Sequence, residues 1–226
     1  MIEHHKNDDS YEQLTGAGHS RRDALKLGGV AALAAVAGGA ALLGHSTPAF
    51  AQTASKAGSL AQDEPLNILI VTYDGGTLLD FAGPSEIFHR LPNTKVRYAS
   101  LNGGHVTLEF GVVYGNTERL ADIEKTDLIL VPGGSNLTAP MGPAYQAQIR
   151  RLAEGAKYVT SVCNGSLVLA ATGVLTGKRS GCHWAFLNEL PKYGAIPVAE
   201  RFVEDDNGRF MSGGGVTAGI DFALRV

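Results

Sequence analysis

Residues 158–172 read Tyr-Val-Thr-Ser-Val-Cys-Asn-Gly-Ser-Leu-Val-Leu-Ala-Ala-Thr, and this stretch decides the fold. Its first part, residues 158–162, is an apolar run with β-branched residues, which predicts a buried strand. Residues 167–171 form an apolar block that predicts a buried helix. Only residues 163–166 lie between them, so the chain must pass from strand to helix through a sharp turn with Cys163 at its pivot.

This turn predicts a nucleophile elbow. The pivot residue is forced into a strained backbone conformation, and Gly165 lets the backbone close up behind it. The sulfur of Cys163 would then stand at the N-terminus of the helix, where backbone N–H groups favour the thiolate over the thiol. We therefore expect an activated nucleophile. The alternative is a small buried cysteine that only packs in the core.

The segments around the elbow predict an α/β fold. Apolar runs indicate strands at 66–71, 96–101 and 127–131, and hairpins are expected at 105–114 and around the turn 205–208. Helices are expected at 79–88, with Pro84 at the helix start, at about 143–153 and at 216–224. Continuous apolar strands that alternate with helices favour a mainly parallel sheet covered on both faces. The fold class is therefore a single-domain, flavodoxin-like three-layer α/β sandwich.

Residues that could take part in catalysis or binding follow the predicted strands directly. In open α/β sheets, ligands bind at the carboxyl ends of the strands, and Asp80, Gly133-Gly134 and Cys163 each lie just past such an end. We expect them to converge. His183 follows another expected strand and is either a third member of the site or a histidine packed beside Trp184. No metal-ligand spacing is found in the sequence, so we expect neither metal nor organic cofactor.

The first 51 residues are interpreted as a twin-arginine signal peptide. Ser20-Arg21-Arg22-Asp23-Ala24-Leu25-Lys26 precedes an uncharged stretch, and Ala49-Phe50-Ala51 offers a signal-peptidase site. The alternative is an uncleaved membrane anchor. The predicted organisation is signal peptide 1–51, flexible leader 52–65 and catalytic domain 66–226. The expected location is periplasmic or secreted, without stable membrane association after cleavage.

Charge argues against a polyanionic partner. The chain carries 19 Lys and Arg against 22 Asp and Glu, a net charge of −3, and no basic run follows the signal. We therefore expect a small-molecule substrate and no nucleic acid, and homodimer formation stays open.

Five motifs together give the chain a resemblance to the ThiJ/PfpI superfamily, the class I glutamine amidotransferase-like group. They are Leu79–Glu86, Val131–Gly134, Ser161–Ser166, Cys182–Trp184 and Phe210–Asp221. Within it, the chain is most similar to the isonitrile hydratases and to the sensor domains of AraC-type regulators. Two departures stand out: isonitrile hydratases carry threonine where this chain has Asn164, and the family normally continues for tens of residues past Val226. The domain is thus expected to be cut short.

The resemblance implies a mechanism. Cys163 would add to the terminal carbon of an isonitrile, Asp80 would deliver a proton to that carbon, and water would release an N-substituted formamide. Because a carboxylate beside a thiolate is a like-charge pair, one of the two should hold a proton near neutral pH. Backbone N–H groups of Gly134 and Asn164 would hold the charge that develops during hydrolysis. His183 would be a third member of the site.

Two other functions stay open at this point. One is a Cys–His hydrolase of amides or peptides with His183 as base. The other is a periplasmic binding or redox-sensing protein in which Cys163 is oxidised rather than catalytic. A Cys163–Cys182 disulfide is also conceivable in an oxidising compartment, but neighbours in an extended segment point to opposite faces. If His183 faces the site, Cys182 should face away into the layer beneath, so we expect both thiols to be reduced.

Overall fold

The computed structural model describes residues 65–226. The predicted signal peptide and all but the last residue of the predicted leader lie outside the described residues, so both stay predictions. No helix within 65–226 is long and apolar enough to span a bilayer.

The described chain is built on an eight-stranded sheet with the order β3-β4-β2-β1-β5-β6-β10-β9. Its inner strands pair in parallel, and only the hairpins at its two edges, β3–β4 and β9–β10, pair antiparallel. The prediction of a mainly parallel sheet is therefore confirmed. The strands are β1 (Leu66–Val71), β2 (Thr94–Ser100), β3 (Gly104–Thr107), β4 (Val113–Arg119), β5 (Leu128–Val131), β6 (Tyr158–Val162), β9 (Phe202–Asp205) and β10 (Phe210–Gly213).

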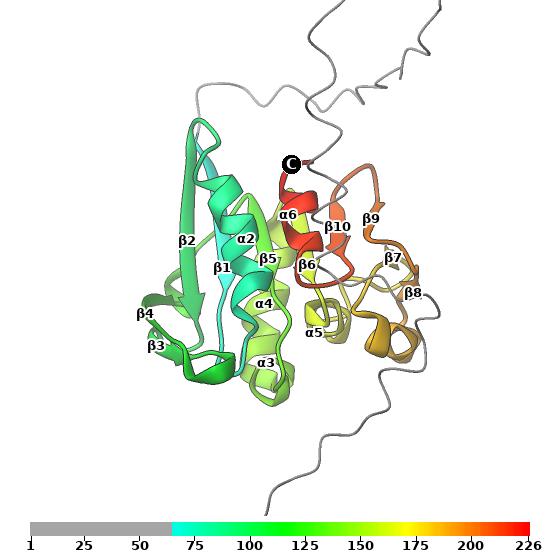
Figure 1. Ribbon diagram of the computed structural model, residues 1–226, viewed down its shortest axis with the longest axis horizontal. Coiled ribbons are helices and arrows are strands. Elements are labelled where there is room, and N and C mark those ends of the chain that lie inside the picture. The colour runs from blue at the N-terminus through cyan, green and yellow to red at the C-terminus, as the bar shows by residue number, and fades with distance from the viewer. Residues whose placement is uncertain (1–64) are drawn as a thin grey trace, which may run out of the picture. The chain divides into compact units, whose positions relative to one another are not determined.

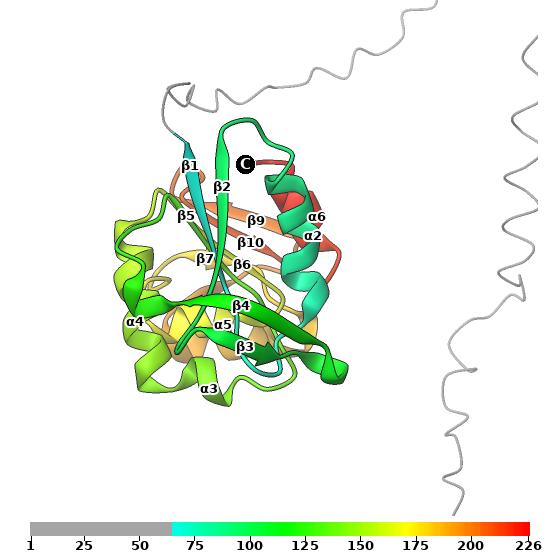
Figure 2. The same ribbon diagram turned by 90° about the vertical axis from the view of Figure 1, so that its left-hand side faces the viewer.

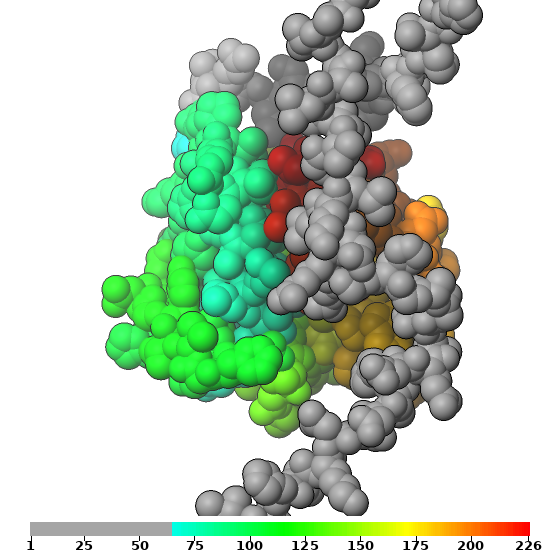
Figure 3. Space-filling view, in the orientation of Figure 1, coloured from blue at the N-terminus to red at the C-terminus, as the bar shows by residue number. Residues whose placement is uncertain are grey.

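Helices cover both faces of this sheet (Figures 1 and 2). One face carries α2 (Leu78–Phe88) and α6 (Ala218–Ala223), which lie side by side on the surface seen in Figure 3. The other carries α3 (Thr138–Met141), α4 (Pro143–Gly155) and α5 (Gly165–Ala171). This arrangement confirms the three-layer sandwich.

The central strands divide their side chains between two buried clusters. In β1, Ile68 and Ile70 pack into the cluster that contains Phe222 of α6, whereas Leu69 and Val71 join the cluster of α4 and α5. Successive side chains of a strand point to opposite faces, so one continuous apolar run supplies both cores. This is why the strands read as unbroken hydrophobic segments.

The prediction that Pro84 starts a helix is wrong. Pro84 lies inside α2, which begins at Leu78. A carbon placed at the Cβ position of Gly219 in α6 would approach the Pro84 ring to 3.0 Å, so the two helices meet tightly at this proline. Tertiary packing here overrides the local preference of proline for the first helical turn.

The strand expected before His183 is only two residues long. It reduces to β7 (Arg179–Ser180), which pairs with β8 (Ile196–Pro197) in a separate two-stranded sheet. His183 is already the N-cap of a 3-10 segment, Trp184–Tyr193. The argument that Cys182 and His183 alternate as in an extended strand therefore does not apply.

Candidate active site

Cys163 occupies a sharp turn between β6 and α5. Its φ of 60° lies in the left-handed region that side chains rarely adopt, and its backbone N–H donates to the carbonyl of Gly213 at 2.9 Å. Behind it, a Cβ on Gly165 would lie 2.3 Å from the carbonyl oxygen of Val131, so only glycine fits there. The predicted elbow geometry is confirmed.

Asp80 reaches the elbow from the first turn of α2. Its side chain is fully buried, and Oδ2 accepts a hydrogen bond from the backbone N–H of Gly133 at 2.9 Å. The second oxygen, Oδ1, is buried without a hydrogen-bond donor among residues 65–226. Asp80 is not the N-cap of this helix, which is Thr77.

Gly133 lies at the point where the site converges. A carbon placed at its Cβ position would lie 2.8 Å from Asp80 Oδ2, 2.8 Å from Cys163 Cβ and 2.3 Å from Asn164 Oδ1. Three side chains from α2 and the β6–α5 turn therefore surround one glycine at the end of β5. The structure brings Asp80, Gly133 and Cys163 together, as the strand ends predict.

The electrostatics of this group reverse one expectation. Burial, followed by the charge of Asp80, raises the pKa of the Cys163 thiol to about 12. The backbone N–H of Asn164 acts in the opposite direction, but it does not overcome burial. The prediction that the start of the helix favours the thiolate at rest is thus wrong, because Cys163 is only 8% exposed and its sulfur faces a carboxyl group.

Asp80 also departs from its ordinary ionisation. Burial raises its pKa to about 6, the hydrogen bond from Gly133 lowers it, and the nearby charge of Glu109 raises it. Near pH 7 the pair therefore carries one proton, which resides on the sulfur of Cys163 and leaves Asp80 as the carboxylate. The expectation that one of the two groups holds a proton agrees with these values.

Asn164 forms a two-way pair with the backbone of Gly134. Its Oδ1 accepts from the Gly134 N–H at 2.9 Å, and its Nδ2 donates to the Gly134 carbonyl at 3.0 Å. The Gly134 N–H is therefore occupied in this arrangement and does not point at a substrate oxygen. Of the two predicted oxyanion donors, the backbone N–H of Asn164 is the one beside the Cys163 sulfur.

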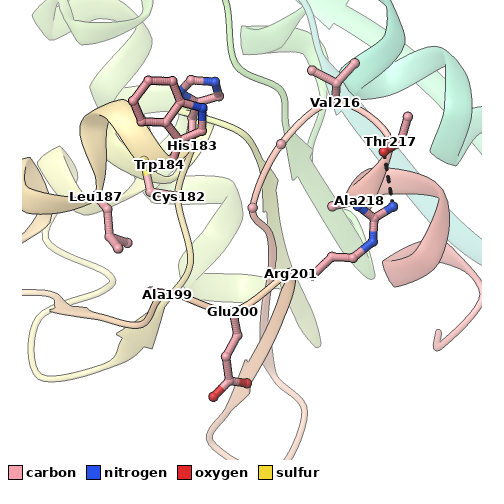
Figure 4. Close-up of a pocket in the computed structure, with 12 residues that line it drawn as sticks. Cys182, His183, Trp184, Leu187, Ala199, Glu200, Arg201, Val216, Thr217 and Ala218 are labelled. Atoms are coloured by element: carbon pink, nitrogen blue, oxygen red, sulfur yellow. Dashed lines mark hydrogen bonds between the residues drawn. The ribbon is translucent and has the colours of Figure 1, made fainter. Parts of the chain in front are cut away.

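His183 belongs to a neighbouring pocket of about 490 Å³ (Figure 4). Its Nδ1 accepts from the Ala185 N–H at 3.3 Å, and its ring lies 5.3 Å from that of Trp184. None of the described hydrogen bonds joins His183 to Cys163, and neither Cys163 nor Asp80 lines this pocket. The structure thus favours the packed interpretation of His183 over a role as partner of the sulfur.

The opposite wall of this pocket is held by Arg201. Its guanidinium pairs with Asp221 and donates to Thr217 Oγ1 at 3.1 Å, the bond drawn in Figure 4. Trp184, which is 81% exposed, stands at the rim. The pocket therefore lies between the 3-10 segment and the turn that leads into α6.

Cys163 and Cys182 are both free thiols. Cys182 is buried in the cluster of α4 and α5, as predicted for a side chain that packs beneath the site. Cys182 also lies at the border of the pocket that His183 lines. Burial raises the pKa of Cys182, and a hydrogen bond with the Ser166 side chain partly offsets that effect.

Two residues near the site escaped the sequence analysis. Tyr73 is fully buried, and its hydroxyl donates to the Pro132 carbonyl at 2.6 Å. Glu109, in the β3–β4 hairpin, accepts from Thr77 Oγ1 at 2.8 Å. Tyr73 follows β1 closely, so the rule that selected the other strand ends could have found it, whereas no local pattern marks Glu109.

In residues 65–226 we find no group of three His, Cys, Asp or Glu side chains able to hold a metal.

Residues 66–226 match the DJ-1/PfpI family. The chain belongs to this family. It is 44% identical over 151 residues to an isonitrile hydratase of Pseudomonas putida, across 65% of this chain and 64% of that protein. It is 31% identical over 126 residues to the HTH-type transcriptional regulator CdhR of Pseudomonas aeruginosa, across 55% of this chain and 37% of the regulator. The chain therefore spans less than two thirds of the length of either relative.

Solved structures of the family share the fold. A ThiJ/PfpI family protein from Pseudomonas syringae superposes with a TM-score of 0.69 at 29% identity, covering 81% of this chain and 74% of that one. Drosophila melanogaster DJ-1beta superposes with a TM-score of 0.63 at 23% identity, covering 71% of this chain and 88% of that one, which supports the fold alone.

Proposed function

We propose that this protein hydrates isonitriles to N-substituted formamides, with Cys163 as nucleophile and Asp80 as the group that moves the proton. The observation that carries the proposal is the buried pair itself, a neutral thiol beside a carboxylate whose pKa is raised to about 6. The similarity to an isonitrile hydratase supports the same chemistry.

The first step forms a carbon–sulfur bond. The Asp80 carboxylate removes the thiol proton as the sulfur of Cys163 attacks the terminal carbon of R–N≡C, and the resulting carboxylic acid returns that proton to the same carbon. The product is a thioimidate, R–N=CH–S–, in which the sulfur atom is the Sγ of Cys163. One proton moves from sulfur to carbon through Asp80, so the carboxylate is regenerated.

The second step releases the product. Water adds to the thioimidate carbon, with one of its protons passing to nitrogen, and gives R–NH–CH(OH)–S on Cys163. Cleavage of the carbon–sulfur bond leaves R–NH–CHO, and the hydroxyl proton returns to the sulfur. The backbone N–H of Asn164 lies beside that sulfur and stabilises negative charge on it as it departs.

The geometry gives less support to a Cys–His hydrolase. Amide hydrolysis builds an oxyanion on the former carbonyl oxygen and needs preorganised N–H donors aimed at it. At the end of β5, the N–H of Gly133 is bonded to Asp80 and that of Gly134 to Asn164. The first step on an isonitrile develops charge on carbon rather than oxygen, so it requires a proton donor and not those two N–H groups.

Turnover of a simple alkyl isonitrile tests this proposal. The purified chain without residues 1–51 is incubated with tert-butyl isonitrile, and the formyl proton of the product is followed by NMR. We expect turnover by the native protein and by Cys182→Ser, and none by Cys163→Ala. Folded native protein that yields no formamide, or Cys163→Ala at the native rate, would refute the proposal.

We also propose that residues 1–51 direct export through the twin-arginine pathway. The support is the sequence pattern around Arg21 and Arg22. Fractionation of cells that express the full chain tests it, with a variant in which both arginines are replaced by lysine as control. Equal amounts of both proteins outside the cytoplasm would contradict it.

A further inference from the structure

We infer that Tyr73 is a positioning residue for the reaction, because it fixes and polarises the peptide group that holds Asp80. This inference deepens the proposed function, on which its kinetic consequence rests. The structural part rests on three buried groups that two hydrogen bonds join in series: the Tyr73 hydroxyl, the Pro132–Gly133 peptide and the Asp80 carboxyl.

The two hydrogen bonds belong to opposite ends of a single peptide group. Tyr73 donates to the carbonyl oxygen of Pro132 at 2.6 Å, and the N–H of Gly133, in the same peptide, donates to Asp80 Oδ2 at 2.9 Å. A hydrogen bond to an amide oxygen polarises the amide and makes its N–H a stronger donor. The phenol of Tyr73 thereby acts on Asp80 without touching it.

The peptide has little freedom to turn away. The next carbonyl, that of Gly133, accepts from the Thr77 N–H at 2.9 Å, so the chain is held on both sides of the Gly133 N–H. Tyr73 is itself anchored by packing, with its ring edge-on to that of Tyr145 at 6.3 Å. The direction of the donor to Asp80 is therefore set by side chains outside the reacting pair.

Charge keeps Tyr73 in the donor form. Burial raises its pKa well above the ordinary value, and electrostatic interactions with Asp80, Cys163, Tyr145 and Glu109 act in the same direction. The ionisable groups that act on Asp80 are Glu109 in the hairpin, whose charge raises its pKa, and Cys163 in the elbow, whose hydrogen bond lowers it. At working pH the hydroxyl is a neutral donor, and its hydrogen bond favours the carboxylate form of Asp80.

Direct titration of Asp80 tests the inference without reference to turnover. Protein labelled with ¹³C at the aspartate carboxyl carbons is titrated by NMR, and the Asp80 signal is assigned by its loss in Asp80→Asn. We expect Tyr73→Phe to move the Asp80 midpoint upward by roughly 0.5 pH unit, because the weakened donor stabilises the carboxylate less. Tyr145→Phe is the matched control: it deletes a buried hydroxyl that bonds the Thr72 carbonyl and not the Pro132–Gly133 peptide.

Two results would overturn the inference. One is an unchanged Asp80 midpoint in folded Tyr73→Phe, and the other is an equal shift in Tyr145→Phe. The kinetic test is a double-mutant cycle on isonitrile turnover. We expect the acid limb of the pH–rate profile to shift to higher pH in Tyr73→Phe. In the Asp80→Asn background, Tyr73→Phe should have no further effect on the rate. If no variant turns over an isonitrile, the proposed function fails while the NMR titration still decides the role of Tyr73.

Discussion

Replacing Gly133 by alanine should dismantle the site. The added methyl group would lie 2.3 Å from Asn164 Oδ1 and 2.8 Å from both Asp80 Oδ2 and Cys163 Cβ. Contacts below 3.0 Å are essentially never seen for a real Cβ, so Asn164 Oδ1 must retreat by about 0.7 Å and Asp80 Oδ2 by a smaller amount. Those shifts weaken the hydrogen bonds that the two oxygens accept from Gly134 and Gly133.

The cost follows from these contacts. Overpacking of a well-packed interior costs about 1 to 3 kcal/mol, and the loss of a neutral hydrogen bond adds about 1 kcal/mol. For a domain of this size we expect the melting temperature of Gly133→Ala to fall by about 5 to 10 °C. We also expect isonitrile turnover to fall at least 100-fold, because Asp80 and Cys163 lose their common geometry.

Thermal unfolding and turnover are measured together, with Gly155→Ala as control. Gly155 ends α4, and a Cβ at that position meets nothing within 4 Å, so its alanine variant should keep native stability and activity. A Gly133→Ala protein that melts and turns over like Gly155→Ala would refute the convergence of the three side chains at Gly133.

Three further outcomes are expected. Burial raises the pKa of Asp80 from 3.8 to about 6, so between these two pH values the folded state binds more protons than the unfolded state. The free energy of unfolding should therefore fall by about 3 kcal/mol as pH rises from 3.8 to about 6. Urea unfolding at several pH values should show that Asp80→Asn lacks this fall, and an equal pH dependence in both proteins would contradict the assignment. Iodoacetamide should alkylate Cys163 more slowly than a free cysteine at pH 8, because the pKa of the Cys163 thiol is raised to about 12. Alkylation should be faster in Asp80→Asn than in the native protein, because the carboxylate charge is gone. Mass spectrometry of the labelled peptide measures both rates, and rapid alkylation of the native protein would show that the thiolate forms at rest. Asn164→Ala should lower stability by about 1 to 3 kcal/mol through loss of both bonds to Gly134, whereas the exposed Asn188→Ala should not, as calorimetry of the two proteins can check.

Local patterns in the sequence were enough to predict the frame of the fold. The run 158–162 and the turn after it define β6 and the elbow, because strand periodicity and a glycine two residues past the pivot are both short-range signals. The strand ends also indicated correctly that Asp80 and Cys163 meet, since parallel strands present their carboxyl ends at one edge. These features depend on a few neighbouring residues each.

The failures concern long-range contacts. The ionisation of Cys163 depends on Asp80, 83 positions earlier, and on burial that no local pattern reports. Asn164 pairs with Gly134 through a side-chain rotamer that only the folded backbone defines. The surroundings of His183 could not be predicted, because the strand before it is only two residues long and the chain then turns into a 3-10 segment.

The proton on Cys163 has a consequence for the chemical lifetime of the protein. Peroxides attack the thiolate rather than the thiol, and a rise in pKa from 9.0 to about 12 lowers the thiolate fraction at neutral pH about 1,000-fold. A thiolate that persisted at this position would be lost progressively to sulfenic and sulfinic acids in the presence of oxidants. Burial, followed by the charge of Asp80, therefore protects the sulfur from oxidants, and in the proposed reaction the thiolate would form only during attack on the substrate.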